Sequence, residues 1–391
     1  MDTKKSLFPI WATAAFSWFG YHCGSGFASG TQVKAYVIRY GAKGIFAVFM
    51  AWICCAAFIW IISEYARLVK AKSYRDVATT IYWPNEALGR VVILVWDIMV
   101  LLSCIVASSS CMAGAGALLQ NLVGAPYWVG CAIFVAVMVF LLCFGEGALN
   151  RLGNISSIMI FLVLAICLAG LVSKGGNLGS VMASYAGEGD TAGAGLGKIL
   201  NSGFTYGCIQ ISFLHTTCVL GGKMDKRSTV NKYILLGFLM NCGVMFVEAL
   251  TIFGYVPEGV MESNMPMLFI VQSFKGAFGL LLLVIYNFVL IMAYVTTAGA
   301  VITGQIARYR GLIGKVIKND FWCKAAIVIF FLLCSSVVAT LGLEGVVTKA
   351  YGFLSNLRKP LWFFPLIILG PISIMRVMKQ QKENPEAPAE A

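Results

Sequence analysis

A cluster of small residues in the first apolar segment has the types and spacing that could bind a ligand. Residues 8–35 are apolar and aromatic at both ends, and six glycines and serines occupy the centre: Gly20, Gly24, Ser25, Gly26, Ser29 and Gly30. Each glycine costs about 1 kcal/mol in a helix interior relative to alanine, so this helix is easily interrupted. An interruption exposes backbone N–H and C=O groups, which are tolerated at membrane depth only where they face protein, water or a ligand. The pattern therefore indicates a site in which freed backbone groups hold an ion or a small solute.

Two other kinds of side chain in apolar segments could take part in the same chemistry. Thr296 and Thr297 lie midway along residues 276–308 and could give hydroxyl oxygens to a sodium ion. Alternatively, each hydroxyl bonds to a carbonyl one turn earlier in its own helix. His22 and His215 both lie in glycine-containing segments. A histidine at membrane depth can carry a proton or contact a substrate, although a neutral histidine held by hydrogen bonds is equally compatible with the sequence.

The substrate site is expected where interrupted helices begin again. The freed N–H groups of Ser25, Gly26 and Phe27 would lie at the positive end of a helix dipole, which favours a carboxylate. Aromatic residues flank this position and its equivalent in residues 195–221, and the serine run at 108–110 either contacts the substrate or allows close helix packing. The predicted substrate-binding residues are His22, Gly24, Ser25, Gly26, Phe27, Ser108, Phe204, Tyr206, Gly207 and Cys208.

The composition of the chain places these residues in a membrane protein. Of its 391 residues, 59% are hydrophobic and 12% are charged, whereas a soluble domain has about 25% charged residues. Ten segments are long and apolar enough to span a bilayer. They are 8–35, 43–69, 89–120, 126–145, 152–173, 195–221, 229–256, 276–308, 321–342 and 359–378, with a short helix expected at 344–356 and a surface segment at 71–87. We therefore predict an all-α polytopic membrane protein.

The basic residues indicate how the chain is oriented. With the N-terminus inside, 20 of the 29 lysines and arginines fall in inner loops, as the positive-inside rule requires. Both termini are then expected in the cytoplasm. This distribution accounts for the net charge of +12 without a nucleic-acid partner.

The second half of the chain is expected to repeat the first half upside down. Gly203 and Gly207 interrupt the segment 195–221, which follows the first span by five spans and so crosses in the opposite direction. Paired interrupted helices of opposite direction are the sequence sign of an inverted repeat. Considered alone, these two glycines could equally serve helix packing. We predict two five-helix repeats, 1–175 and 190–380, with helices 1 and 6 broken at mid-membrane, and a disordered cytoplasmic tail at 381–391.

A short motif in the first span resembles a known group of transporters. The string Gly24-Ser25-Gly26-Phe27 resembles the G-x-G motif in the first helix of the amino acid–polyamine–organocation superfamily. The longer string 24–30, followed by Gln32, is similar to the signature of the uncharacterised YkvI-type bacterial membrane proteins. With the ten-span layout, the resemblance implies the LeuT fold, a bacterial plasma-membrane location, and transport of amino acids or related solutes driven by sodium or protons.

The resemblance also implies a sodium site. In that fold the hydroxyls of the eighth span meet carbonyls of the first, which here gives Gly20, Cys23, Ala293, Thr296 and Thr297 as the sodium ligands. Some relatives replace the ion by a lysine from the fifth span. The segment 152–173 contains no lysine or arginine, which favours the ion.

Two acids in apolar segments need partners or protons. Asp97 lies in the inner third of its span and could pair with a basic residue at a cytoplasmic gate, and Glu248 lies in the seventh span. A charge at such depth costs about 2.5–3.5 kcal/mol on insertion scales. The sequence leaves the role of Glu248 open.

The predicted function is sodium-coupled symport of a small amino acid or related organic solute by alternating access. Proton-coupled transport through His22 is one alternative, and a non-transporting nutrient or germinant receptor on the same fold is another. A soft-metal site built from His22, Cys23 and Cys208 is a third. No H-E-x-x-H or G-x-S-x-G motif is present, so we expect neither an enzyme nor a cofactor other than the coupling ion. The expected partners are the solute and the lipid bilayer.

Overall fold

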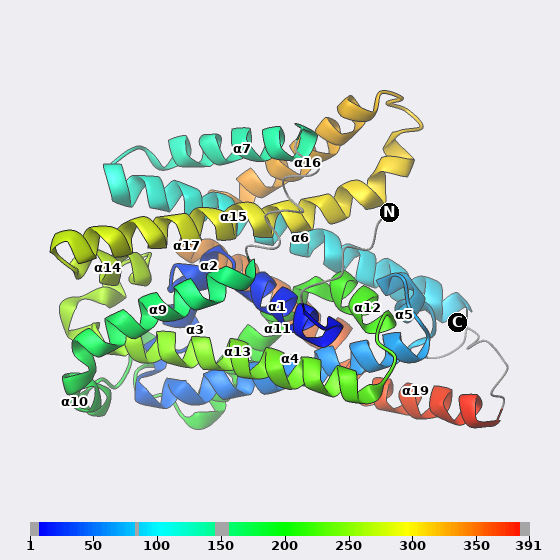
Figure 1. Cartoon of the computed structure of the whole chain (residues 1–391), viewed down its shortest axis with the longest axis horizontal. Helices are drawn as coiled ribbons and strands as arrows, with labels where there is room; N and C mark the ends of the chain where they lie inside the picture. Colours follow the sequence, from blue (N-terminus) through cyan, green and yellow to red (C-terminus); the bar gives the residue numbers. More distant parts are fainter. Residues whose placement is uncertain (1–7, 83–85, 145–155, 384–391) are drawn as a thin grey trace.

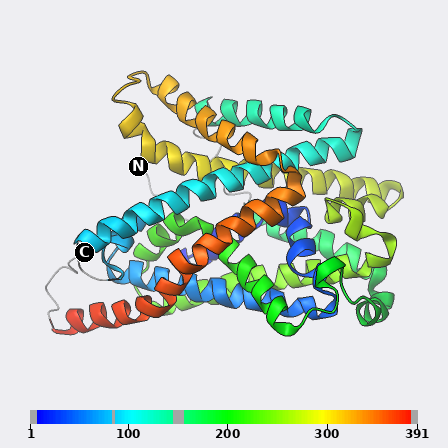
Figure 2. The same cartoon turned by 180° about the vertical axis from the view of Figure 1, so that it is seen from behind.

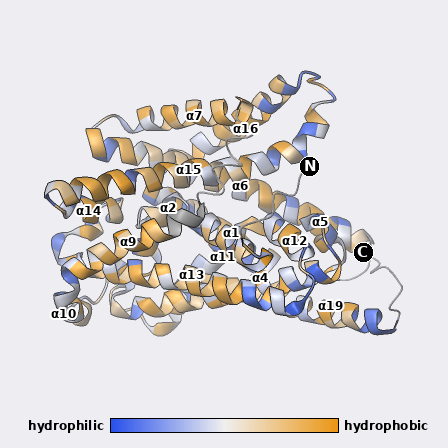
Figure 3. Cartoon of the chain, in the orientation of Figure 1, coloured by the Kyte–Doolittle hydropathy of each residue, from blue (hydrophilic) through white to orange (hydrophobic). Residues whose placement is uncertain are grey.

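The structure is a computed structural model that describes residues 8–82, 86–144 and 156–383. Eight helical stretches in these ranges are long and apolar enough to cross a membrane. Large apolar side chains such as Phe140, Phe161 and Val284 remain more than half exposed on them, as expected for helices that face lipid. Figure 3 shows that the long helices are hydrophobic along most of their length, with polar residues toward their ends. The chain is therefore a multi-pass membrane protein.

The long helices have the following bounds. They are α4 (Ile45–Leu68), α6 (Glu86–Val123), α7 (Tyr127–Phe144), α9 (Ser156–Lys174), α13 (Arg227–Gly254), α15 (Gly276–Ile313), α16 (Asp320–Ala339) and α19 (Phe364–Glu383). Shorter helices occur between them: α5 (Tyr74–Thr80), α10 (Leu178–Ser184) and α14 (Pro266–Ser273). The helix α5 lies in the predicted surface segment 71–87.

The first predicted span is divided into three helices, α1 (Ile10–His22), α2 (Ser25–Ala28) and α3 (Thr31–Tyr36). After α1 the N–H of Gly24 bonds to the carbonyl of His22 at 2.7 Å instead of reaching back four residues. A second irregular turn follows α2, where Gly30 has φ +80°, a conformation that glycine adopts without strain. The small residues noted in the sequence therefore lie at or beside non-helical turns.

The sixth predicted span is divided at a different place from the one expected. The helix α11 (Leu196–Gln210) runs without interruption through Gly203 and Gly207, and the irregular 3₁₀ turn comes afterwards at Ile211–Phe213, before α12 (Leu214–Gly222). A Cβ atom at Gly203 would lie 2.3 Å from the carbonyl oxygen of Ala47 in α4. The expected break at the two glycines is wrong, because their missing side chains serve close packing against α4.

The C-terminal region is one continuous helical stretch, not a linker helix followed by a separate span. It consists of α17 (Gly342–Gly345), a π-helical turn, α18 (Tyr351–Arg358), a second π-helical turn and α19. The two π-helical turns are Val346–Ala350 and Lys359–Phe363. Residues 381–383 of the predicted tail belong to α19, and residues 384–391 lie outside the described residues, as do the predicted ends of the fourth and fifth spans.

The interrupted helices lie between two groups of long helices. In one group α6 packs against α7, α15 and α16, and in the other α4 packs against α11, α12 and α13. The helix α1 packs against α13 and α9, whereas α2 contacts α6 and α15. Figures 1 and 2 show the two groups on opposite sides of the molecule, with α1 and α11 near its middle. This arrangement places both irregular turns in the interior.

Candidate functional site

The two irregular turns border one internal cavity. Its volume is about 50 Å³, several times the ~10–15 Å³ that a single water molecule needs. Of the residues predicted for the substrate and sodium sites, five line this cavity: His22, Gly24, Ser25, Gly26 and Thr297. The end of α11 contributes Ile209 and Gln210 to the lining, and the turn that follows contributes Ser212 and Phe213.

Thr297 presents an unpartnered hydroxyl to the first interruption. Its oxygen is buried and has no hydrogen-bond partner within the described residues. A Cβ atom at Gly24 would lie 3.7 Å from this oxygen and equally far from the Thr297 methyl carbon, so the side chain of Thr297 lies beside the turn. In a regular helix the N–H of residue 24 would bond to the carbonyl of Gly20, but it bonds to His22 instead. A free hydroxyl therefore lies near a turn whose carbonyls have lost helical donors.

Thr296 differs from its neighbour. Its hydroxyl donates to the carbonyl of Met292 at 2.7 Å and lies 3.4 Å from that of Ala293. The alternative that the sequence left open, a bond back to the same helix, is the arrangement found for Thr296 but not for Thr297. The Thr296 hydroxyl is therefore bonded within its own helix, whereas the Thr297 hydroxyl is available to bind a ligand.

His22 is held at both ring nitrogens. Nδ1 lies 2.9 Å from Oδ1 of Asn241, and Nε2 lies 2.8 Å from the hydroxyl of Tyr206. The amide nitrogen of Asn241 donates to the carbonyl of Gly237 at 2.7 Å, which turns its oxygen toward the ring. Nδ1 must therefore carry a hydrogen in this arrangement, and a neutral ring accepts the hydroxyl hydrogen of Tyr206 at Nε2.

The hydroxyl of Tyr206 connects His22 to two amides at the cavity. It lies 3.2 Å from Oε1 of Gln32, which also accepts from the side chain of Gln210 at 3.4 Å. One hydroxyl hydrogen cannot serve both His22 and Gln32. A proton added to Nε2 would reverse the first bond and release the Tyr206 hydrogen to Gln32, so the protonation of His22 changes a group that lines the cavity.

Of the remaining predicted substrate residues, some lie near the cavity and others do not. The Oγ atoms of Ser25 and Ser110 are 2.6 Å apart, so the serine run reaches the cavity region through Ser110, while Ser108 is buried outside the lining. The ring of Phe27 lies 4.0 Å from that of His22. Phe204 packs instead on Phe363, with ring centroids 4.8 Å apart.

The backbone around Gly207 and Cys208 does not offer the expected N–H groups. Both residues lie inside α11, where N–H groups bond within the helix. A Cβ atom at Gly207 would lie 2.6 Å from the carbonyl of Ala51, and the carbonyl of Cys208 accepts from Arg358. In the first span α2 has only four residues, so its summed dipole is smaller than that of the longer half-helix that we expected.

Several residues of the site were not predicted from the sequence. Gln210 and Tyr351 line the cavity, and Asn241 fixes His22. The usable signal was the presence of amide side chains inside apolar segments, where an unpaired polar group is costly. Gln32 was noted only as part of the motif, although it is buried and joins two elements.

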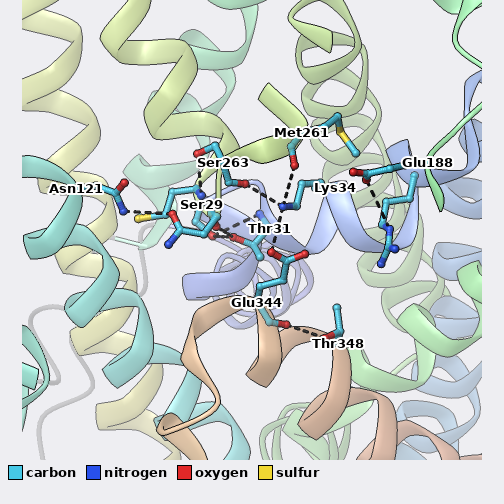
Figure 4. A network of polar contacts seen from close by, with 12 residues as sticks. Ser29, Thr31, Lys34, Asn121, Glu188, Met261, Ser263, Glu344 and Thr348 are labelled. Carbon is cyan, nitrogen blue, oxygen red and sulfur yellow. Dashed lines mark hydrogen bonds and ion pairs between the residues drawn. The ribbon is translucent and has the colours of Figure 1, made fainter. Parts of the chain in front are cut away.

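A polar network joins α3 to two segments distant in the sequence, as Figure 4 shows. The ammonium of Lys34 is buried and donates to the carbonyls of Ser263 at 2.9 Å and Met261 at 3.3 Å. It also forms an ion pair with Glu344 at 3.3 Å, whose side chain is 45% exposed. Thr31 donates to the carbonyl of Asn264 at 2.7 Å. This Lys34 network ties the outer part of the interrupted first span to the loop before α14 and to α17.

A second network surrounds Asp97 of α6, which has partners on α5 and α15. Figure 1 shows α5 at the opposite end of the molecule from α14. The carboxylate of Asp97 pairs with Arg75 at 2.9 Å and with Arg308, and it accepts from the hydroxyl of Tyr74. Burial, assisted by Asp97, raises the pKa of Tyr74 to about 12, so this hydroxyl remains a donor. The ring of His215 lies 5.9 Å from that of Tyr74. The expectation that Asp97 pairs with a basic residue is confirmed.

Glu248 remains without a partner in the described part of the chain. Both its carboxyl oxygens are buried and make no hydrogen bond there. It belongs to α13, which packs against α1, the helix that ends at the first interruption. No group of three or more His, Cys, Asp or Glu side chains suited to a metal ion occurs among the described residues.

The comparisons with known proteins agree with this architecture. No family model matches the chain. The uncharacterized membrane protein YkvI of Bacillus subtilis (strain 168) is 22% identical over 277 residues, which are 69% of this chain and 74% of that protein.

Three solved structures have a similar fold. A substrate-bound, outward-open Na⁺-coupled sialic acid symporter has a TM-score of 0.62 at 11% identity and covers 96% of this chain and 90% of its own. MhsT in complex with L-phenylalanine has a TM-score of 0.59 at 13% identity and covers 94% and 98%. The manganese transporter of Eremococcus coleocola has a TM-score of 0.56 at 14% identity and covers 95% and 84%. These proteins are transporters and not enzymes, and the chain shares their fold, the LeuT fold that the first-span motif implied.

Proposed function

We propose that this protein is a sodium-coupled symporter of a small amino acid or related organic solute. The observation that carries the proposal is the buried Thr297 hydroxyl, which has no partner in the described chain and belongs to a side chain that lies beside the turn at Gly24. Sodium binds where several oxygens converge without a competing cation, and interrupted helices supply such oxygens as free carbonyls. The proposed ligands are this hydroxyl and the carbonyls of Gly20, Cys23 and Ala293. Thr296 is omitted because its hydroxyl already has an acceptor.

The order of the helices supports the two proposed repeats. Counted together, the two interrupted segments and the eight apolar stretches make ten spans. Four stretches lie between the interrupted segments and four follow the second, so the interrupted segments occupy equivalent positions in two five-span halves, 1–175 and 190–380. An odd number of spans in each half inverts the second relative to the first.

Alternating access requires a constraint at each end of the site. The Lys34 network closes one end and the cluster around Asp97 lies at the other. With both termini in the cytoplasm, as the positive charges indicate, the Lys34 network is the outer constraint. Opening either end would break ion pairs that join separate helices, which gives two discrete states between which substrate and ion shift the population.

The cavity favours a small substrate with polar groups. The cavity has a volume of about 50 Å³. Unless the lining residues move, it holds little more than a fragment of a small amino acid. The hydroxyl of Ser25 and the amides of Gln32 and Gln210 converge on it. Polar groups placed in a small cavity fix the orientation of a ligand.

The proposal is tested by uptake of labelled amino acids into proteoliposomes with and without an inward sodium gradient. Thr297→Ala should lose most of the sodium-dependent uptake, about tenfold or more, which corresponds to ~1.4 kcal/mol per factor of ten. Thr296→Ala is the matched control and should keep it, because that hydroxyl is bonded within its own helix. Equal losses in the two variants, or uptake that ignores sodium, would contradict the sodium site.

Proton coupling through His22 is the second candidate. The observation that favours it is the chain of hydrogen bonds from Asn241 through His22 and Tyr206 to Gln32, in which one added proton changes the donor at the cavity. Uptake that depends on a pH gradient, is unaffected by sodium and is abolished in His22→Ala would support this candidate over sodium.

A further inference from the structure

Arg358 is a buried cation at the end of α18. Its side chain has no exposed surface, although it belongs to the residue type that is rarely buried without a partner. It lies just before the second π-helical turn, on the C-terminal helical stretch that packs against α11. Neither the substrate site nor the sodium site proposed above uses it.

The guanidinium of Arg358 is bound by the last carbonyls of α11. Nη1 donates to the carbonyl of Ile209 at 2.7 Å and to that of Cys208 at 3.0 Å. Nη2 donates to the hydroxyl of Ser103 in α6 at 2.5 Å. The charged group also lies over the ring of Trp362, 5.6 Å from its centroid. These contacts join three separate parts of the chain at the point where the sixth span is interrupted.

No carboxylate lies among these partners in the described chain. Buried charges are normally paired, because desolvation costs several kcal/mol per ion. Here the compensation comes from the C-terminal end of α11, which is followed by the 3₁₀ turn at Ile211–Phe213. The carbonyl of Ile209 also accepts from the hydroxyl of Ser212 at 2.6 Å, whereas Arg358 is the side-chain donor to the carbonyl of Cys208. The free carbonyls at a helix C-terminus carry a partial negative charge that favours a cation.

We propose that Arg358 is a fixed cation that fills the carbonyl end of the interrupted sixth span. In broken membrane helices, such carbonyl ends otherwise coordinate the coupling ion. The carbonyls of Cys208 and Ile209 are therefore not available to a sodium ion or to the ammonium group of a substrate. Given the transport function proposed above, the mobile cation binds at the first interruption, beside Thr297, and the sixth span carries its own charge. Arg358 is thus a positioning residue that acts through the backbone of α11.

The inference predicts that the charge can be replaced from solution. The full-length protein is purified in detergent, and its thermal unfolding midpoint is measured for the wild type, Arg358→Ala, Arg358→Lys and Lys359→Ala. Arg358→Ala should unfold at a lower temperature, and low-millimolar guanidinium should restore part of the loss, whereas choline at the same ionic strength should not. Arg358→Lys should keep most of the wild-type midpoint because it retains the charge.

Lys359 provides a matched control. It is the adjacent cation, and its ammonium donates to the side chain of Thr205 at 2.8 Å instead of to the end of α11. Lys359→Ala should show no rescue by guanidinium. The inference is wrong if guanidinium fails to rescue Arg358→Ala, or rescues both alanine variants equally. If Arg358→Ala cannot be purified, Arg358→Lys provides the test. An unfolding midpoint of Arg358→Lys well below that of the wild type would contradict the inference, because a positive charge at this position would then not be enough to stabilise the end of α11.

Sodium activation of uptake gives a second readout. Uptake by the wild type should be activated by one sodium ion. Uptake by Arg358→Ala should depend more steeply on the sodium concentration, because the substitution frees the carbonyls at the end of α11 for a second sodium ion. An unchanged steepness in a folded variant contradicts the inference. The unfolding measurement does not depend on transport, so the two proposals can fail separately. If guanidinium rescues Arg358→Ala but the protein takes up no amino acid, the proposed transport function is wrong and the role of Arg358 as a fixed cation still holds.

Discussion

The first and sixth spans each contain an irregular turn, but the backbone groups at the two turns have different partners. In the first, the turn between α1 and α2 faces a cavity, a free threonine hydroxyl and His22. In the sixth, the carbonyls of Cys208 and Ile209 at the end of α11, just before the corresponding turn, accept from Arg358. We propose that the first interruption offers its backbone to a ligand, whereas at the second the chain itself supplies a cation to the backbone. The comparison teaches that an irregular turn at membrane depth marks a place where backbone groups need partners, and that the partner need not be a ligand.

The glycines of the two spans differ in the same way. A side chain at Gly24 would meet only the side chain of Thr297, at 3.7 Å, whereas one at Gly203 would strike the backbone of Ala47 at 2.3 Å. The first glycine leaves space at a site, and the second allows two helices to approach closely.

The largest effect on stability is expected from Gly203→Ala. The added methyl group has to push α11 away from α4, because the atom it meets belongs to the backbone. Overpacking of this kind costs about 1–3 kcal/mol, and thermal unfolding in detergent measures it. Gly243→Ala is the matched control within α13, where the space around the Cβ position is open. If Gly203→Ala unfolded at or above the wild-type temperature, the packing role of this glycine would have to be abandoned.

An intermediate effect is expected from Lys34→Met. The variant leaves the carbonyls of Met261 and Ser263 without their buried donor, at a cost of about 1–3 kcal/mol. Glu344→Gln removes only the half-exposed partner of the ion pair, and such pairs contribute about 0–1 kcal/mol. Unfolding midpoints of both variants would show whether Lys34 closes α3 chiefly through backbone carbonyls. A larger loss for Glu344→Gln than for Lys34→Met would mean that the ion pair dominates instead.

The smallest effect on stability is expected from Gly24→Ala. The backbone of Gly24 is extended, with φ −80° and ψ −176°, which alanine adopts without strain. The methyl group would nevertheless lie against the Thr297 hydroxyl, so the sodium concentration for half-maximal uptake should rise about fivefold, or ~1 kcal/mol. Sodium titration of uptake, together with an unfolding curve, separates the two effects. Unchanged sodium dependence would show that the ion does not lie beside this turn.

The sequence predicts the fold well because its signals are local. Apolar length identifies the long spans, and a dense group of glycines and serines in residues 8–35 indicates where the first span loses regularity. The sequence also predicts that Asp97 has a basic partner, because a charge in an apolar segment is costly unless it is paired.

The irregular turn of the sixth span was misplaced for a physical reason. Gly203 and Gly207 look the same in sequence whether they interrupt a helix or let α4 approach, and only the neighbouring helix decides. The cation that stabilises the true turn, Arg358, follows Ile209 by 149 residues. The different roles of Thr296 and Thr297 likewise depend on which of two adjacent side chains faces Gly24, which no residue pattern specifies.

The helix that carries Arg358 is sensitive to the number of its residues. π-Helical turns lie on both sides of α18, at Val346–Ala350 and Lys359–Phe363. A turn of this kind accommodates one residue more than an α-helical turn, and one residue corresponds to about 100° of rotation about the helix axis. Loss of a single residue from the first π-helical turn would restore regular winding and keep the guanidinium on its side of the helix, whereas loss of a residue within α18 would rotate it by about 100° away from α11 relative to everything upstream. Deletions and insertions within α18 should therefore be far less tolerated during evolution than changes of one residue in the π-helical turns beside it.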